Sequence, residues 1–215
     1  SWSVGNHDSV RVATRWNRGA YDPAFSKVVL AMQLSLKGTP CLYQGDELAL
    51  TEAEIAFEDL QDPYGITFWP EFKGRDGCRT PIPWDGAQAN AGFSDGKPWL
   101  PVPAEHAARA VAGQERDAAS TLQFARRFMA WRKQSAHLRQ GDIVFFDAPE
   151  PVLAFKRELP GQGAVFAAFN LGAQTVQFPW PEVARAADFG GHGMAGSNQA
   201  GGLSLPPYGA WFGTV

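Results

Sequence analysis

The sequence has few of the residues that build disulfide frameworks and metal sites. Only two cysteines, Cys41 and Cys78, and four histidines occur among its 215 residues. Neither cysteine belongs to a CxxC pair or lies at a metal-ligand spacing from a histidine, and His106, His137 and His192 are scattered. We therefore expect reduced thiols, no disulfide, no metal or cofactor, and no chemistry from these three histidines.

Strong charge of one sign and long apolar runs are also missing. The formal net charge is −3, and no basic run or stripe occurs, which makes nucleic acid and anionic membranes poor candidates as partners. No apolar run approaches the length that would cross a bilayer. From these absences we expect a cytoplasmic protein.

Aromatic residues, by contrast, are frequent. They make up 13% of the chain and include eight tryptophans, within an apolar fraction of 45%. Such a composition is typical of a folded protein, and the length leaves room for one large or two small domains with a sizeable core. Most of these rings must pack in the core, although flat rings also suit the binding of sugars.

A polar triplet near the N-terminus, Asn6-His7-Asp8, follows a short apolar run that we interpret as a strand over 2–5. It groups an amide, an imidazole and a carboxylate, which suits recognition of a hydroxyl-rich ligand. By itself the triplet is a weak signal, since most polar triplets after a strand are loop or cap residues.

Two further stretches give the triplet its context. The first, 39–47, reads Thr-Pro-Cys-Leu-Tyr-Gln-Gly-Asp-Glu, and the second, 74–85, reads Gly-Arg-Asp-Gly-Cys-Arg-Thr-Pro-Ile-Pro-Trp-Asp. In this order and spacing, the three stretches together resemble the C-terminal part of α-glucosidases of the α-amylase family (glycoside hydrolase family 13). The resemblance extends over essentially the whole chain.

The hydrophobic pattern of the first half predicts an α/β fold. Asp22-Pro23 starts a helix whose apolar residues recur at helical spacing, and Gly38 ends it. A short apolar strand over 41–43 follows at once, so strand, helix and strand imply a parallel sheet. We expect a long functional loop over 51–97 with a short helix through 52–60, and an irregular surface segment over 99–113.

The second half predicts a different class of fold. A helix over 117–137 begins with a capping box formed by Ser120 and Gln123. Beyond it, short apolar segments separated by turns predict an antiparallel β-sandwich. We expect these strands at 143–146, 152–155, 164–170, 175–178 and 203–205, with a last turn and strand over 206–212.

The resemblance implies a domain organisation that fits these patterns. Residues 1–140 would form the last strands, helices and active-site loop of a (β/α)₈ TIM barrel, and residues 141–215 the C-terminal antiparallel β-sandwich domain. Functional groups of such a barrel gather beyond the carboxyl ends of its strands, where Asp8, Asp46 and Glu47 lie in the predicted pattern.

The resemblance also implies roles for particular residues. Asp8 would stabilise the oxocarbenium-like transition state of a retaining glycoside hydrolysis, while His7 and Arg75 would bind the sugar. The further candidates are Asn6, which we interpret mainly as a residue that orients its neighbours, and Arg79, which we expect to hold the loop through backbone carbonyls or Asp76.

Other candidates have a stronger structural interpretation. Glu47 and its neighbour Asp46 are read as loop-fixing or rim residues, with substrate contact the less favoured alternative. Tyr64, Phe68 and Trp69 could line the rim of the site, but anchoring of the loop is the safer interpretation.

The nucleophile and the general acid of this family come from earlier barrel strands, which the sequence does not contain. We therefore expect a fragment of an α-glucosidase that cleaves terminal α-linked glucose from short oligosaccharides or glucosides, with transglucosylation as a side activity. Its partners would be that substrate and the missing N-terminal part of the barrel, without which the chain would be inactive. The alternative is a non-catalytic glycosidase-like partner or sugar-binding module.

Overall fold

The computed structural model describes residues 1–17, 19–180, 185–187, 194–199 and 202–215, so His192 lies outside the described residues. The chain forms two compact units, one of residues 3–26 and 41–123, the other of residues 1–2, 27–40 and 124–215. The predicted division between 1–140 and 141–215 stays a prediction. Among the described residues, no helix has the length and apolar character needed to span a membrane.

The strands predicted over 2–5 and 41–43 are wrong. The structure has a single isolated parallel bridge between Trp2 and Pro40, in which the Trp2 amide donates to the Thr39 carbonyl at 2.9 Å. The direction of this bridge is the predicted one, but two or three residues cannot sustain a parallel ladder without further strands beside them. All sheets among the described residues are antiparallel.

The first long helix forms as the sequence predicts. Helix α2 spans Pro23–Ser35, and the Asp22 carboxylate accepts from the Ala24 amide at 2.8 Å. Its apolar stripe is buried, at residues Phe25, Val28, Val29 and Met32. Gly38 follows in the left-handed conformation, with φ of 113°, which favours glycine after a helix.

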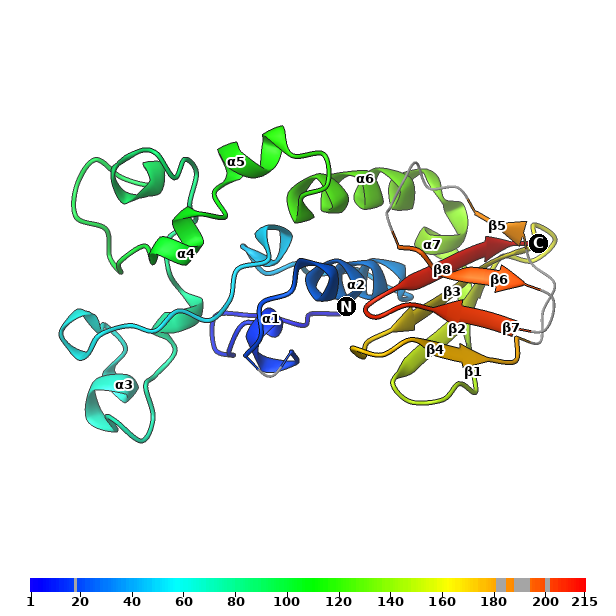
Figure 1. Ribbon diagram of the computed structural model, residues 1–215, viewed down its shortest axis with the longest axis horizontal. Coiled ribbons are helices and arrows are strands. Elements are labelled where there is room, and N and C mark those ends of the chain that lie inside the picture. Colours follow the sequence, from blue (N-terminus) through cyan, green and yellow to red (C-terminus); the bar gives the residue numbers. More distant parts are fainter. Residues whose placement is uncertain (18, 181–184, 188–193, 200–201) are drawn as a thin grey trace. The chain divides into compact units, whose positions relative to one another are not determined.

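The unit of residues 3–26 and 41–123 is built from short helices and turns (Figure 1). Its α-helices are α1 (Val12–Arg15), α3 (Pro63–Thr67), α4 (Ala104–Ala107) and α5 (Val111–Arg116). Single 3₁₀ turns cover Asp46–Leu48, Phe57–Asp59, Asp76–Cys78 and Ala89–Gly92. Small apolar clusters hold these pieces together, one around Leu60 and Leu100 and another around Leu48 and Leu122.

Two predictions in this unit need correction. The helix predicted through 52–60 is wrong, because this segment contains only the 3₁₀ turn Phe57–Asp59, and its Ala53 amide donates to the Gly77 carbonyl at 3.1 Å. The segment over 99–113 is not irregular surface chain, since it contains α4 and part of α5 and buries Leu100 and His106. Its alanines favour helix, and Pro103 precedes the first turn of α4.

The helix predicted over 117–137 is divided in two. Helix α6 spans Thr121–Gln134 and α7 spans Ala136–Gln140, with Ser135 between them capping α7 through its bond from the Leu138 amide. Asp117 holds a turn before α6, which delays the start of the helix. Ser120 does accept from the Gln123 amide at 3.1 Å, but the Gln123 side chain donates to the Glu115 carbonyl, so the capping box is half formed.

The C-terminal strands form two antiparallel sheets, and the predicted antiparallel arrangement is confirmed. The larger sheet has the order β1-β2-β3-β8-β5, formed by Asp142–Phe146, Val152–Glu158, Ala164–Asn170, Ala210–Thr214 and Arg185–Ala186. The smaller has the order β4-β7-β6, formed by Val176–Phe178, Gly202–Leu205 and Ser197–Gln199. β5 and β6 are too short to have been detected from alternation.

One apolar cluster joins these two sheets face to face (Figure 1). Phe166 and Trp211 contribute from the larger sheet, while Phe178, Leu203 and Leu205 contribute from the smaller. The central strand β3 is buried along its whole length. This is the core expected of a sandwich, in which side chains from two inner faces interlock.

A buried arginine binds backbone carbonyls in the same unit. The Arg157 guanidinium is fully buried in β2 and donates to the carbonyls of Ser35, Leu138 and Gly141. Burial lowers the pKa of Arg157 to about 10, which still leaves it charged at neutral pH. The side chain therefore satisfies backbone acceptors from two segments that are separate in sequence, the end of α2 and the end of α7.

Replacing Arg157 by leucine should destabilise this unit. Arg157→Leu leaves buried carbonyls without donors, and we expect the free energy of unfolding to fall by about 2–4 kcal/mol. Lys156→Leu, on the same strand, removes a partly exposed pair with Glu158 and should cost less than about 1 kcal/mol. Urea unfolding followed by tryptophan fluorescence measures both, and equal losses in the two variants would contradict the assigned role.

Candidate active site

Asp8 lies in a loop whose own side chains shape it. The Asn6 side-chain oxygen accepts from the Asp8 amide at 2.8 Å, which fixes a local turn of the kind asparagine favours. His7 Nε2 lies 3.4 Å from Asp8 Oδ2, and both side chains are exposed. Asn6 thus acts on the backbone that carries Asp8, whereas His7 lies beside the carboxylate itself.

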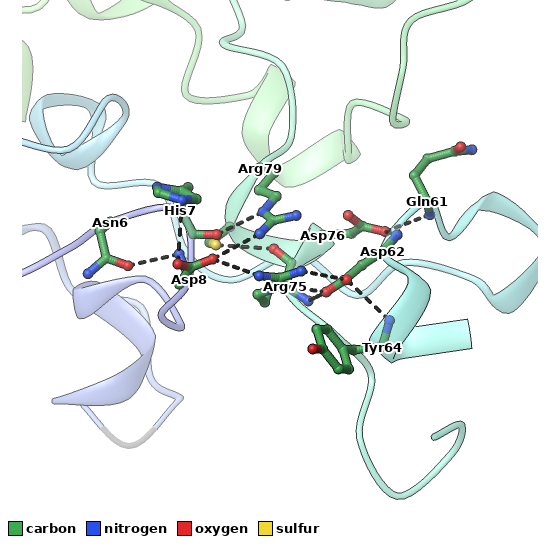
Figure 2. A network of polar contacts seen from close by, with 10 residues as sticks. Asn6, His7, Asp8, Gln61, Asp62, Tyr64, Arg75, Asp76 and Arg79 are labelled. Carbon is green, nitrogen blue, oxygen red and sulfur yellow. Dashed lines mark hydrogen bonds and ion pairs between the residues drawn. The ribbon is translucent and has the colours of Figure 1, made fainter. Parts of the chain in front are cut away.

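Two arginines from one distant loop converge on Asp8 (Figure 2). Arg75 Nη1 and Arg79 Nη2 each donate to Asp8 Oδ1 at 3.0 Å. Both arginine side chains are about a quarter exposed, against half for Asp8. The three residues therefore form one surface cluster with a carboxylate at its centre, and the structure brings together two of the residues that the sequence singled out for the sugar site, Asp8 and Arg75.

The electrostatics of this cluster keep Asp8 charged. Desolvation acts to raise the pKa of Asp8, but hydrogen bonds from Arg75 and Arg79 and the neighbouring His7 outweigh it. The pKa of Asp8 therefore lies below its ordinary value of 3.8. An ionised carboxylate of this kind suits acceptance of hydroxyl hydrogens and stabilisation of positive charge, and it is poorly suited to act as a general acid.

Arg79 also holds the backbone of the triplet. Its Nε donates to the His7 carbonyl at 2.7 Å, which is a backbone contact of the expected kind. Asp76 has another task, because its Oδ2 accepts from the amides of Gln61 and Asp62 at 2.7 Å each (Figure 2). The Arg79 backbone amide also donates to the Asp76 carbonyl at 3.0 Å, so Arg79 contacts Asp76 through the main chain.

Sequence reasoning missed Asp62, which holds Arg75 from behind. Asp62 is buried, and its two oxygens accept from Arg75 Nε at 2.8 Å and Nη2 at 2.9 Å (Figure 2). The signal was present, since Asp62-Pro63 repeats the Asp-Pro helix start that correctly located α2 at Asp22-Pro23. The pair with Arg75 had no sequence signal, because it links residues 13 positions apart across an irregular loop.

The neighbouring aromatic side chains divide into two groups. Tyr64 lies against Arg75, with the guanidinium carbon 5.3 Å from its ring centre, and Phe68 stacks beside Tyr64. Both rings are more than half exposed. Trp69 instead packs on the cluster around Leu60 and Leu100, so its place is that of a loop anchor.

Asp46 lies beneath the triplet and is buried. Its Oδ2 accepts from the Tyr43 amide at 3.2 Å, and a side chain on Gly5 would meet this carboxylate at 3.3 Å. Burial raises the pKa of Asp46 to about 6, against the opposing effect of Arg11. Asp8 and Asp46, which follow the two segments at the bridge, are thus perturbed in opposite directions.

Glu47 fixes its own turn. Its Oε2 accepts from the Gly45 amide at 2.8 Å. Gly45 has φ of 96°, a left-handed conformation that favours glycine, so the turn depends on both residues. Contact of Glu47 with substrate stays a prediction.

The remaining polar groups of the sequence analysis lie elsewhere. His106 is buried, with Nδ1 3.2 Å from Thr80 Oγ1 and Nε2 2.9 Å from the Thr51 carbonyl, and burial lowers its pKa to about 4. Cys41 and Cys78 are free thiols. Among the residues whose placement is described, no group of three or more His, Cys, Asp or Glu side chains is arranged to hold a metal ion.

Asp46 should make stability depend on pH. Because its folded pKa of about 6 exceeds the ordinary 3.8, the folded state keeps a proton that the unfolded chain releases between these values. The free energy of unfolding should therefore fall as pH rises from about 4 to about 6, by up to roughly 2–3 kcal/mol. Asp46→Asn keeps an acceptor for the Tyr43 amide and should remove this part of the slope.

Urea unfolding at a series of pH values from about 4 to 7 measures that slope. Glu47→Gln serves as the matched variant, because the Glu47 charge is the weakest of the contributions to the raised pKa of Asp46, so the slope should decrease only slightly. A slope in Asp46→Asn equal to that of the unsubstituted chain would show that another group is responsible.

Comparisons with known proteins converge on one family. A family profile described as "Alpha amylase, catalytic domain" matches residues 1–141. A probable alpha-glucosidase of Rhizobium meliloti (strain 1021) is 45% identical over 212 residues, and a probable oligo-1,6-glucosidase 2 of Bacillus subtilis (strain 168) is 31% identical over 198 residues. The alignments cover 98% and 82% of this chain but only 38% and 35% of those relatives.

Comparison with solved structures points to the same family. The alpha-glucosyl transfer enzyme XgtA matches 99% of this chain with a TM-score of 0.94 and 50% identity. The trehalulose synthase MutB from Pseudomonas mesoacidophila MX-45 matches 98% of it with a TM-score of 0.83 and 25% identity. The matched regions are 39% and 42% of those chains, so this chain spans well under half the length of the relatives that it resembles.

Proposed function

Because the chain belongs to the α-amylase family, glycoside hydrolase family 13, we propose that it is part of a retaining α-glucosidase. The complete enzyme hydrolyses terminal α-linked glucose from short oligosaccharides or glucosides. The present chain contributes the carboxylate that stabilises the transition state and part of the wall that binds the sugar. It contributes neither the nucleophile nor the general acid.

The observation that carries this proposal is the fixed, ionised carboxylate of Asp8. Two guanidinium groups hold it at 3.0 Å each, yet half of its side chain remains exposed. In the reaction, Asp8 accepts hydroxyl hydrogens of the sugar, and its negative charge stabilises the positive charge that develops at the anomeric carbon. His7 and Arg75, on either side of Asp8, donate to the same sugar ring.

The described carboxylates close to Asp8 are unsuited to the other two roles. A retaining glycosidase needs a nucleophile and an acid about 5–5.5 Å apart on opposite sides of the scissile bond. Asp62 is buried and fully engaged with Arg75 and backbone amides, and Asp46 is buried beneath the loop. We therefore assign the nucleophile and the acid to a part of the enzyme that precedes Ser1.

The proposed architecture follows from this division of labour. Residues 1–140 supply the last strands, helices and active-site loop of a (β/α)₈ barrel, and residues 141–215 form the C-terminal β-domain. The family match over residues 1–141 supports this boundary. The isolated parallel bridge of Trp2 to Pro40 supports a barrel whose other strands lie in the preceding part.

Transfer of glucose to other acceptors is the proposed second outcome of the reaction. XgtA, which is 50% identical over nearly the whole of this chain, is an alpha-glucosyl transfer enzyme. A mutant of MutB has been crystallised with its substrate sucrose. A covalent glucosyl intermediate, which retention requires, can be resolved by water or by a sugar hydroxyl.

The 215-residue chain by itself should be inactive. Without the nucleophile and the acid, Asp8 can bind and polarise but cannot form or break the glycosidic bond. We expect no release of nitrophenol from p-nitrophenyl α-glucoside by the pure chain above that of its Asp8→Asn variant. Turnover by the chain that Asp8→Asn abolishes would refute the proposed division of labour.

In the complete enzyme, Asp8→Asn should reduce kcat by about 10³-fold and change KM far less, because the lost interaction develops in the transition state. Asp95→Asn, an exposed acid outside the cluster, is the matched control and should retain activity. Steady-state kinetics on a glucoside measure both variants. A complete protein that binds glucosides without turnover would instead support the non-catalytic sugar-binding alternative.

A further inference from the structure

We propose that Asp62 is a positioning residue that sets the orientation of the Arg75 guanidinium toward Asp8 and the sugar. The catalytic role of Asp62 rests on the proposed function, whereas its hold on Arg75 can be tested without activity.

The contacts of Asp62 constrain Arg75 at three points. Asp62 Oδ2 accepts from both the Arg75 backbone amide and Nε at 2.8 Å, and Oδ1 accepts from Nη2 at 2.9 Å. A parallel pair of hydrogen bonds fixes the plane of a guanidinium as well as its position. Nη1 is then the nitrogen left to face Asp8, to which it donates at 3.0 Å.

Asp62 is itself anchored on the side away from Arg75. Its backbone amide donates to Asp76 Oδ2, and its carboxylate accepts from the Tyr64 amide at the start of α3. The Tyr64 ring in turn lies against the guanidinium of Arg75. The carboxylate is therefore held by its own loop, and an Arg75 that moved would have to break several contacts together.

The charges favour the same arrangement. Hydrogen bonds from Arg75 hold the pKa of Asp62 far below its ordinary value, so Asp62 stays ionised at any pH at which the enzyme works. The Asp62 side chain is fully buried, whereas that of Arg75 is 29% exposed. A buried carboxylate whose partner reaches the surface acts as a fixed support, and Arg75 is the part that presents donors to a ligand.

Asparagine at position 62 tests this role sharply. Asp62→Asn offers one acceptor and one amide donor, so it cannot receive two parallel N–H groups and repels one of them. If Asp62 positions Arg75, the guanidinium leaves Asp8, and the loss of a direct hydrogen bond should raise the pKa of Asp8. If Asp62 supplies only negative charge, Arg75 stays and the pKa of Asp8 should fall.

Carbon-detected NMR titration of the Asp8 carboxyl in the 215-residue chain measures the sign of this shift. We expect the pKa of Asp8 to rise in Asp62→Asn, together with loss of the protected Arg75 Nε–H signal. We expect no change of the Asp8 pKa in Asp59→Asn, which removes an acid three residues earlier. A fall or no change of the Asp8 pKa in Asp62→Asn would overturn the proposal, as would an equal rise in Asp59→Asn. Asp62→Glu keeps two acceptor oxygens, so the rise of the Asp8 pKa should be smaller in this variant than in Asp62→Asn.

Kinetics of the complete enzyme provide the second readout. Misplacement of Arg75 should lower kcat/KM in Asp62→Asn by roughly 10²-fold, while Asp59→Asn keeps the activity of the unsubstituted enzyme. Unchanged kcat/KM in Asp62→Asn would overturn the catalytic part of the inference. If the complete enzyme cleaves no α-glucoside although the NMR shift is found, the proposed function fails and the positioning of Arg75 stands.

Discussion

The candidate site depends on the pairing of a buried carboxylate with a guanidinium that reaches the surface. Asp62 and Arg75 form a bidentate ion pair that joins the start of the short helix α3 to a loop 13 residues further along the chain. This pair positions Arg75, and Arg75 in turn holds Asp8, the exposed acid at the centre of the site. A loop can hold catalytic groups accurately only where such interactions replace regular secondary structure.

Asp8 and Asp46 each follow a segment that the sequence predicts as a strand, and they show how environment determines the chemistry of a carboxyl group. Asp8 is exposed and faces two arginines, which lowers its pKa, whereas Asp46 is buried with a single backbone donor and has its pKa raised. The same side chain therefore presents charge to a ligand at one position and supports the loop at the other. The position of each aspartate after a predicted strand does not reveal which of these two roles it has.

Much of the fold and part of the site could be predicted from the sequence. Local signals located α2 from Asp22-Pro23, and short apolar segments separated by turns located the main strands of both C-terminal sheets. Asp8 and Arg75 were singled out by their motifs, and the structure brings them into contact. These successes share a cause, since the signals lie in short contiguous stretches.

Most of the failures depend on contacts between distant stretches. The apolar runs at 2–5 and 41–43 lack the neighbouring strands that a parallel ladder needs, and the 52–60 segment donates a backbone hydrogen bond to Gly77. Ser135 interrupts the helix predicted over 117–137 because its side chain caps the next turn. Asp62 was missed for the same reason, because its partner is defined only once the loop has folded.

The convergence of Arg75 and Arg79 on a single oxygen gives the Asp8 carboxylate two unequal sides. Both guanidinium groups bind Oδ1, whereas His7 Nε2 lies 3.4 Å from Oδ2. Rotation about the last side-chain bond would exchange the oxygens and break two charged contacts, so the group cannot turn to meet a ligand. Under the proposed function, a sugar therefore brings its hydroxyls to Oδ2, and the carboxylate acts as a directional acceptor that favours hydroxyls arriving from that side.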